Sequence, residues 1–317
     1  MFRSPFQPTA FCISANAGAK WLVVGAVAAL DTIGLTYCGI RLDFGGLAHG
    51  CGAITLLAGI ATFYTYRRPD ARIADLAHTA ALLLAFFAAA GVLSYLVAAT
   101  DIPLADAKFA AADRALGFDW QAWFAWVHRH PSFWLVLRLV YASAIPQVIA
   151  ITVYLALSGQ PKRNSEFLWA IMLSLLVIIP ISALAPAAGA WVQYGAMRFA
   201  DVAQVHDFFA MRSGMLHALD LPRLEGLINF PSFHTTLAIF FVYAVRRRMA
   251  LLAFAAALNG VMIVAVLTEG GHYLVDAISG AAVAGAAITA AGRIEAALAR
   301  KPLRAEPRRA PDTPVRT

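Results

Sequence analysis

The sequence predicts an all-α integral membrane protein, a bundle of about eight transmembrane helices with an additional interfacial helix. Of the 317 residues, 61% are hydrophobic and only 14% are charged, and the mean hydropathy is +0.69. A soluble protein carries roughly a quarter charged residues, and a core of this size cannot hide such an apolar excess. The composition therefore excludes a water-soluble enzyme, a disordered chain and a disulfide-stapled secreted domain.

Apolar runs locate the membrane-spanning segments, because a helix needs about 20 apolar residues to cross the hydrocarbon core. The sixth run is short, since three consecutive arginines end it at 246–248. The first 20 residues lack a continuous apolar stretch, so we expect no cleaved signal peptide and interpret the first run as an uncleaved anchor. The eight runs cover approximately 20–40, 46–66, 74–99, 132–158, 166–187, 234–248, 249–268 and 272–291.

The segments between and after the spans are expected to lie at the membrane surface or in water. Residues 101–130 carry too many charges to span, and their Trp and Phe residues indicate an interfacial helix. A polar loop over about 188–230 separates the fifth and sixth spans. We therefore divide the chain into N-terminal transmembrane helices (1–100), a catalytic membrane core (101–291) and a disordered, Pro- and Arg-rich cytoplasmic tail (292–317).

The distribution of Lys and Arg predicts the orientation of the helices. Of the 25 cations, 17 fall in segments on the side of the N-terminus and 7 on the opposite side, and Arg138 alone lies inside a span. The positive-inside rule then places both termini in the cytoplasm. This bias accounts for the net charge of +7 without a basic face for nucleic acid, so we expect a lipid bilayer as partner and no nucleic acid.

Two polar clusters lie at the starts of the sixth and eighth spans. These two spans run in the same direction, so both clusters lie at the outer face. The first covers 229–236 and reads NFPSFHTT, and the second covers 269–276 and reads EGGHYLVD. Because one inward and one outward span separate them, we expect His234 and His272 to face one another at one membrane depth. His272 and Asp276 are four residues apart on one helix face, so the carboxylate can accept a hydrogen bond from the imidazole and raise its nucleophilicity.

The backbone around these residues favours an anion. Gly270 and Gly271 leave room for a bulky group at the start of the eighth span, where the N–H groups of a helix N-terminus attract phosphate. Ser232 is placed to cap the sixth span or to donate a hydrogen bond. Apart from Glu269, no further ligand lies near the two histidines, so we expect no metal and no cofactor.

The motifs FPSFHTTL and GGHYLVDAISG resemble the second and third signature motifs of the type 2 phosphatidic acid phosphatase superfamily. The HYxxD form is closer to the branch that contains inositol phosphorylceramide synthase and sphingomyelin synthases. The segments DRALGFDW and LRLVYAS also look like bacterial members of that branch. The resemblance covers roughly 110–285 and implies a six-helix phosphatase-type core in the bacterial inner membrane, with the active site on the periplasmic side.

The resemblance also implies a two-step phosphoryl transfer from a phospholipid or another lipid phosphate, without a metal. His272 would form a phosphohistidine and Asp276 would orient its ring. His234 would protonate the leaving oxygen and then activate the acceptor, which is water for a phosphatase or an alcohol for a transferase. Ser232 and Gly271 would bind the substrate at the phosphoryl group.

Two arginines are candidates for meeting the phosphate charge, because the Lys-x6-Arg-Pro motif and the SRx5H arginine of the phosphatase branch are missing. Arg138 lies about two turns inside the fourth span, and Arg212 lies in the outer loop. A solvated loop charge is the alternative for Arg212, and a structural ion pair with Asp31 is the alternative for Arg138.

Two other classes of protein remain as alternatives. A transporter or lipid flippase would use Asp31, Arg138 and Asp276 as a relay of intramembrane charges, although no inverted repeat is recognisable. The second alternative is a structural protein that has both motifs but no enzymatic activity. The residues do not choose the lipid donor, the water or alcohol acceptor, or the oligomeric state.

Overall fold

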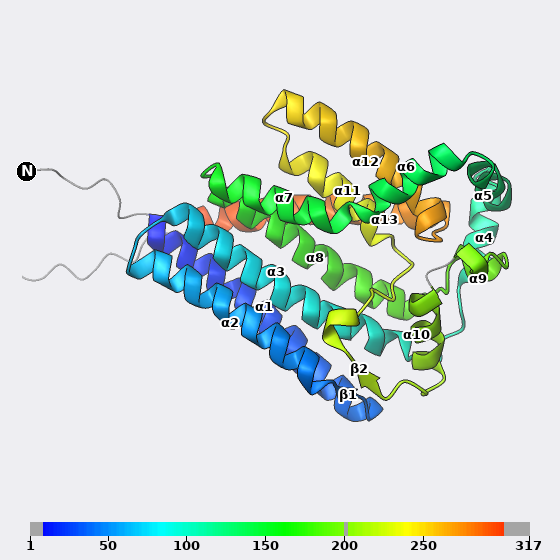
Figure 1. The fold of residues 1–317 in the computed structure, drawn as a ribbon, viewed down its shortest axis with the longest axis horizontal. Helices are drawn as coiled ribbons and strands as arrows, with labels where there is room; N and C mark the ends of the chain where they lie inside the picture. Colours follow the sequence, from blue (N-terminus) through cyan, green and yellow to red (C-terminus); the bar gives the residue numbers. More distant parts are fainter. Residues whose placement is uncertain (1–8, 200–201, 301–317) are drawn as a thin grey trace, which may run out of the picture.

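The computed structural model describes residues 9–199 and 202–300, which fold into a bundle of helices (Figure 1). Long helices run along the bundle, and short ones gather at one of its ends. The helices are α1 (Thr9–Cys38), α2 (Phe44–Tyr66), α3 (Ala71–Ala98), α4 (Asp106–Ala115), α5 (Trp120–His128), α6 (Pro131–Ala142), α7 (Ala144–Leu157), α8 (Pro161–Leu184), α9 (Ala190–Gln193), α10 (Val202–Arg212), α11 (Phe233–Ala244), α12 (Met249–Glu269) and α13 (Leu274–Arg300).

The long helices confirm the predicted all-α membrane bundle. Within the described residues, six helices are long and apolar enough to cross a membrane, namely α1, α2, α3, α8, α12 and α13. Helices α6 and α7 make a seventh span if the pair, bent by 48°, is counted as one. The bend falls at Ser143, three residues before Pro146, whose ring and missing N–H oppose a continuous helix.

Helix α11 is present where the sixth span was predicted, but it is shorter than a span. Its 12 residues cover about 18 Å, against a hydrocarbon core of about 30 Å. Ser232 caps its start, and the arginines at 246–248 follow its end. The predicted count of about eight spans therefore becomes six, or seven with the bent pair, plus this short apolar helix. Because α7, α8, α12 and α13 pack around α11, the first motif starts inside the bundle.

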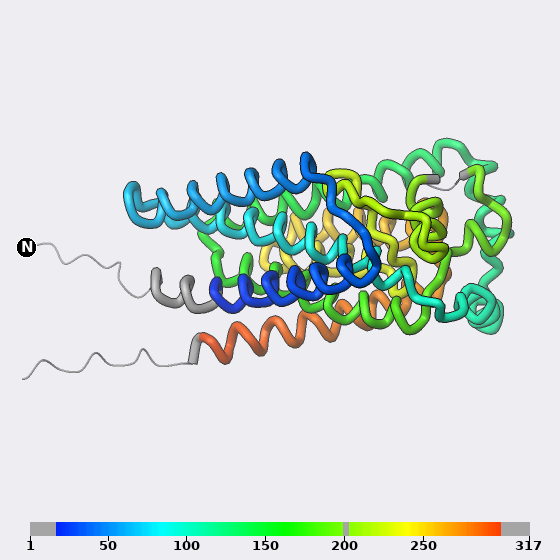
Figure 2. The backbone as a smooth tube through the Cα atoms, turned by 90° about the horizontal axis from the view of Figure 1, so that it is seen from below, coloured from blue at the N-terminus to red at the C-terminus, as the bar shows by residue number. Residues whose placement is uncertain are grey.

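The described ends of the chain lie at the same end of the bundle, which we call the terminal end. Figure 1 shows α4, α5, α9 and α10 at the other end, which we call the motif end. Figure 2 shows α1 running between α3 and α13, in agreement with the contacts of α1 with both helices. Helix α13 continues to Arg300, so the segment 292–300 is helical and not part of a disordered tail as predicted. Residues 301–317 of that tail lie outside the described residues.

The motif end is more structured than the sequence indicates. The predicted interfacial helix is two helices, α4 and α5, separated by Gly117, which has a φ of 79°. Asp119 caps α5 by accepting a hydrogen bond of 3.0 Å from the Ala122 N–H. The predicted loop at 188–230 contains α9, α10 and a strand, β2 (Ala218–Leu219), which pairs in parallel with β1 (Arg41–Leu42).

Candidate active site

The two motifs meet at the motif end, where α11 and α13 begin. His234 lies in the first turn of α11, and His272 lies just before α13. The two imidazoles are close enough for their charges to interact. The ring of Tyr141 connects them, because it stacks on His234 with centroids 4.1 Å apart and reaches Gly270 with its hydroxyl. The structure therefore brings both predicted histidines together and adds Tyr141 between the motifs.

His272 and Asp276 form a buried pair. The Nδ1 atom of His272 lies 3.2 Å from Asp276 Oδ2, and the exposed fractions are 3% and 0%. The same Oδ2 atom accepts a hydrogen bond of 2.9 Å from the Tyr273 N–H. A carboxylate at Nδ1 favours the tautomer with its proton on that nitrogen, which leaves the lone pair on Nε2. The pair thus has the arrangement of an oriented nucleophile.

Ser232 joins the two motif helices. Its side chain is fully buried, and its Oγ accepts from the Thr235 N–H at 3.3 Å, as an N-cap does. Its own N–H donates to the Asp276 carbonyl at 3.0 Å. A side chain at Gly280 would collide with the Ser232 carbonyl, so only glycine permits this approach of α13 to α11. Ser232 therefore fixes the spacing between His234 and the His272–Asp276 pair.

The N-terminus of α13 is not free to bind phosphate, contrary to the prediction. Asp113 of α4 accepts hydrogen bonds from the Leu274 N–H at 2.9 Å and the Val275 N–H at 3.0 Å. Its side chain is fully buried, and burial raises the pKa of its carboxyl while the two N–H bonds lower it. A carboxylate of the protein itself therefore occupies the place where the helix dipole would attract an anion.

Asp106, two turns before Asp113 on α4, holds the other side of the motif. It accepts hydrogen bonds from the Ala188 and Gly189 N–H groups at 2.9 and 2.8 Å and from the Tyr273 hydroxyl at 2.9 Å. Burial, together with the neighbouring Asp106 carboxylate, raises the pKa of the Tyr273 hydroxyl, so Tyr273 stays protonated as a donor. Sequence reasoning missed both carboxylates, although their spacing of seven residues places them on one helix face.

Three indole groups hold the end of α12, just before the motif turn. Helix C-termini leave carbonyl groups without partners, and indole N–H groups satisfy two of them here. Each of the three hydrogen bonds measures 2.9 Å: from Trp120 to the Leu267 carbonyl, from Trp191 to the Thr268 carbonyl and from Trp134 to the Glu269 carboxylate. The indoles come from α5, α9 and α6, so three separate elements fix the approach to His272.

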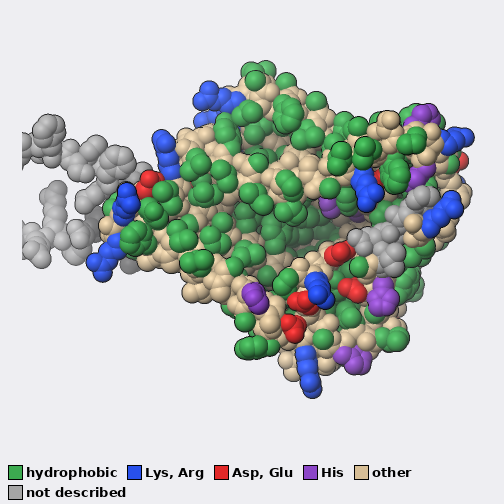
Figure 3. Space-filling model, viewed as in Figure 1, with side chains coloured by type: hydrophobic (Ala, Val, Ile, Leu, Met, Phe, Trp, Pro, Cys, Tyr) green, Lys and Arg blue, Asp and Glu red, His purple; other side chains and the backbone are tan. Residues whose placement is uncertain are grey.

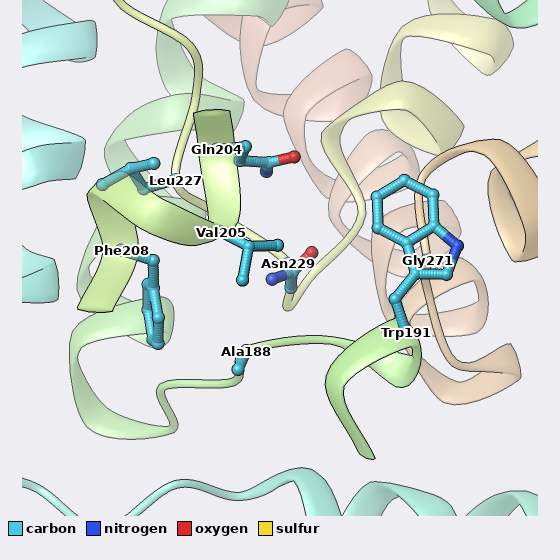
Figure 4. Close-up of a pocket in the computed structure, with 8 residues that line it drawn as sticks. All are labelled: Ala188, Trp191, Gln204, Val205, Phe208, Leu227, Asn229 and Gly271. Carbon is cyan, nitrogen blue, oxygen red and sulfur yellow. The ribbon is translucent and has the colours of Figure 1, made fainter. Parts of the chain in front are cut away.

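The turn itself requires glycine at position 271. Gly271 has a φ of 58°, and an added Cβ would lie 2.6 Å from the Trp191 ring. Its carbonyl accepts a hydrogen bond of 2.7 Å from the Ala190 N–H. Gly271 also lines a small recess between α9, α10 and the motifs. Figure 4 shows Trp191 and Phe208 on opposite sides of this recess, with Asn229 between them.

Of the two predicted arginines, Arg138 lies beside the motifs. It lies on α6, one turn from Tyr141 and one turn from Trp134, which contact the motif residues His234 and Glu269. The exposed guanidinium of Arg138 is close enough to interact with the Glu269 carboxylate. No salt bridge joins Arg138 to Asp31 among the described residues.

Arg212 is held on α10 by other contacts. Its Nη2 donates to the Ile102 carbonyl at 2.8 Å, and its guanidinium lies 5.8 Å from the centre of the Phe208 ring. These contacts attach α10 to the segment before α4.

The space-filling view shows a hollow on the face seen in Figure 1, lined by hydrophobic side chains with histidine at its edge (Figure 3).

The fold and this arrangement define an α-helical membrane protein with a buried His–Asp pair and a second histidine beside it. A family model described as the PAP2 superfamily matches residues 107–290, and the chain belongs to this superfamily, that of the type 2 phosphatidic acid phosphatases. No curated protein and no solved structure matches the chain. The membership confirms the predicted superfamily and a lipid phosphatase-type enzyme, and does not favour a transporter or flippase. Within the described residues, no group of three or more His, Cys, Asp or Glu is placed to hold a metal ion.

Proposed function

We propose that the protein transfers a phosphoryl or phospho-headgroup from a lipid phosphate ester through a phosphohistidine at His272. The observation that carries this proposal is the buried His272–Asp276 pair, whose 3.2 Å contact leaves Nε2 with its lone pair. In the first step, Nε2 attacks phosphorus and the bond from phosphorus to the leaving oxygen breaks. The Asp276 carboxylate stabilises the positive charge that develops on the imidazole ring.

His234 is proposed as the proton carrier for both steps. It first donates a proton to the leaving oxygen, because an alkoxide is a poor leaving group. It then takes a proton from the acceptor hydroxyl, whose oxygen attacks phosphorus while the bond to Nε2 breaks. The stack of Tyr141 on His234 limits rotation of the imidazole and so supports this role.

The phosphoryl oxygens are proposed to lie on the side of Tyr141 and Arg138. Asp113 fills the N-terminus of α13, so a phosphate there would meet a carboxylate. Arg138 lies on the motif side of α6, whereas the recorded contacts of Arg212 bind it to Ile102 and Phe208. We therefore assign the phosphate charge to Arg138 and keep Ser232 and Gly271 as groups that shape the site.

The acceptor is proposed to be an alcohol, as in the branch with inositol phosphorylceramide synthase. The HYxxD form of the GGHYLVDAISG motif and the missing phosphatase arginines support this choice. The distribution of Lys and Arg supports a bacterial inner-membrane protein with cytoplasmic termini and a periplasmic active site. The leaving lipid and the acceptor would then both reach the site from the outer leaflet.

Turnover of the purified protein with candidate lipid phosphates tests the proposal. Phosphate release without an added alcohol, and headgroup transfer with one, separate the two acceptors. His272→Ala and His234→Ala should abolish both reactions in protein that is still folded at the assay temperature. His130→Ala is the matched control, since His130 is an exposed histidine whose Nδ1 lies 2.7 Å from the Trp126 carbonyl of its own turn. Turnover in His272→Ala equal to wild type would overturn the proposal.

A further inference from the structure

A second polar recess lies at the terminal end, far from the motifs. It is small and opens between α8 and α11. Charged and hydroxyl-bearing side chains form one part of its wall, and hydrophobic side chains form the other. The lining residues are Arg163, Glu166, Phe167, Ala170, Phe240, Tyr243, Ala244 and Arg246.

The polar part of this recess has more positive than negative charge. Glu166 is the one carboxylate in its lining, and it binds Arg246 Nη2 at 3.0 Å and the Tyr243 hydroxyl at 2.8 Å. Arg163 is not paired with it, because its two Nη atoms donate to the Gln160 side chain and the Ala244 carbonyl. The recess therefore holds two guanidinium groups against a single carboxylate.

One donor in the recess has no acceptor. Arg163 is 7% exposed, and no hydrogen-bond partner is recorded for its buried Nε atom among the described residues. A buried donor without an acceptor is costly, so native structures rarely leave one. Arg246 lines the same recess, so a second positive charge lies on its wall beside Arg163. An anionic oxygen in the recess would satisfy both the hydrogen bond and the charge.

The hydrophobic part of the wall indicates which kind of molecule carries the anionic oxygen. Phe167, Ala170 and Phe240 line this part of the recess and are otherwise buried. In a membrane helix bundle, an apolar surface that continues from a cationic one fits an acyl chain below a phosphate. Basic pockets between transmembrane helices bind the headgroups of anionic lipids in this way.

We propose that this recess binds an anionic phospholipid of the leaflet at the terminal end, with its phosphate at Arg163 and Arg246. One acyl chain would follow Phe167 and Phe240. The site is separate from the catalytic one, because Tyr243 lies nine residues after His234 on α11, about 13 Å along the helix. The proposal therefore does not depend on the phosphoryl-transfer reaction.

Native mass spectrometry of the purified, delipidated full chain tests this site. The protein is titrated with phosphatidylglycerol, with phosphatidylcholine and with inorganic phosphate. Arg246→Gln should weaken binding of phosphatidylglycerol at least fivefold and leave phosphatidylcholine unchanged. Arg68→Gln, an exposed arginine of the α2–α3 turn, is the matched control and should stay within twofold of wild type. His272→Ala should bind phosphatidylglycerol as wild type does, which keeps this test distinct from the catalytic one.

Arg246→Lys keeps the positive charge and serves where Arg246→Gln does not fold. It should retain an affinity for phosphatidylglycerol between those of wild type and the Gln variant. Equal losses in the Arg246 and Arg68 variants would mean a diffuse surface effect and would overturn the site. Equal binding of phosphatidylcholine, or inorganic phosphate that displaces the lipid completely at equal concentration, would contradict an anionic phospholipid as the ligand.

Discussion

The bundle has two clusters of buried polar groups, one at each end, and they are satisfied in different ways. At the terminal end, Lys20 of α1 donates to the Ser165 hydroxyl of α8, which donates to the Glu295 carboxylate of α13 at 2.5 Å. At the motif end, the His272–Asp276 pair leaves one imidazole nitrogen with its lone pair. The first cluster neutralises its charges internally, whereas the second keeps a nitrogen lone pair that is not used in the His272–Asp276 contact. Burial of polar groups alone therefore does not mark the active site.

The terminal cluster also explains how the N-terminal helices join the core. Asn164 of α8 donates to Asp75 at 2.9 Å and to Thr79 at 3.0 Å, both on α3. With the Lys20 bonds, this network links α1, α3, α8 and α13. Helices α1 and α3 lie before the matched residues 107–290, so the network fastens additional helices to the superfamily core. We expect this network to affect stability and not turnover, and the following predictions separate it from the cluster at the motif end.

Asp276→Asn should give the largest loss of turnover among these predictions. The amide keeps the size of the side chain but removes the charge that orients His272 and stabilises its positive form. We expect kcat to fall about 10²- to 10⁴-fold, as for other carboxylates that orient a catalytic histidine. Steady-state kinetics with the lipid phosphate measures the effect. A loss smaller than fivefold would mean that the pair is structural.

Arg138→Gln and Arg212→Gln separate the two candidate arginines. Removal of a cation that binds the phosphoryl oxygens should lower kcat/KM about 10²-fold. We assign this binding to Arg138, so we expect this loss for Arg138→Gln. Arg212→Gln should change kcat/KM less than threefold and lower the melting temperature, because it releases the Ile102 carbonyl. The reverse pattern would assign phosphate binding to Arg212.

Asp113→Ala tests whether α4 positions the nucleophile. Loss of the cap at α13 should displace His272 and lower kcat about 10-fold or more, while KM stays within twofold. Asp70→Ala is the matched control, since it removes the cap of α3 at the terminal end, away from His272. Both variants should lose about 1 kcal/mol of stability. Equal kcat values in the two variants would limit Asp113 to a structural role.

Lys20→Met should have the smallest effect on turnover and a large effect on stability. The substitution removes a buried positive charge from the network that contains the Glu295 carboxylate, which should cost about 3–5 kcal/mol. The kcat of protein that stays folded should remain within twofold of wild type, because the cluster lies at the opposite end from His272. Thermal unfolding in detergent, with kcat measured well below the melting temperature, checks both parts. A tenfold loss of kcat would connect the two clusters.

Most of the long helices and the contact between His272 and Asp276 could be predicted from the sequence, because both depend on local patterns. Long apolar segments indicate membrane-spanning helices. A spacing of four residues places His272 and Asp276 on one helix face. The length of α11 was overestimated because Val245 and the three arginines after it were counted as part of a span, although the helix ends at Ala244. Hydropathy reports apolar content, and it does not report where a helix ends.

The supports of the motif turn could not be predicted from the sequence. The Asp113 bonds to the Leu274 and Val275 N–H groups cross more than 160 residues of chain. The indole bonds of Trp120 and Trp191 likewise depend on the packing of α5 and α9 against α12. Such partners are set by tertiary structure, so the helix N-terminus was predicted to be free for phosphate when a carboxylate of α4 already fills it.

Phosphorylation of His272 is the most direct test of the central claim. The protein is mixed with its lipid phosphate and quenched at high pH, where phosphohistidine is stable, and the phosphorylated residue is located by mass spectrometry. The account predicts a phosphoryl group on His272 in the wild-type protein, its absence in His272→Ala, and its accumulation in His234→Ala when the substrate has a good leaving group. Turnover with no phosphorylated His272 at any quench time would contradict the account.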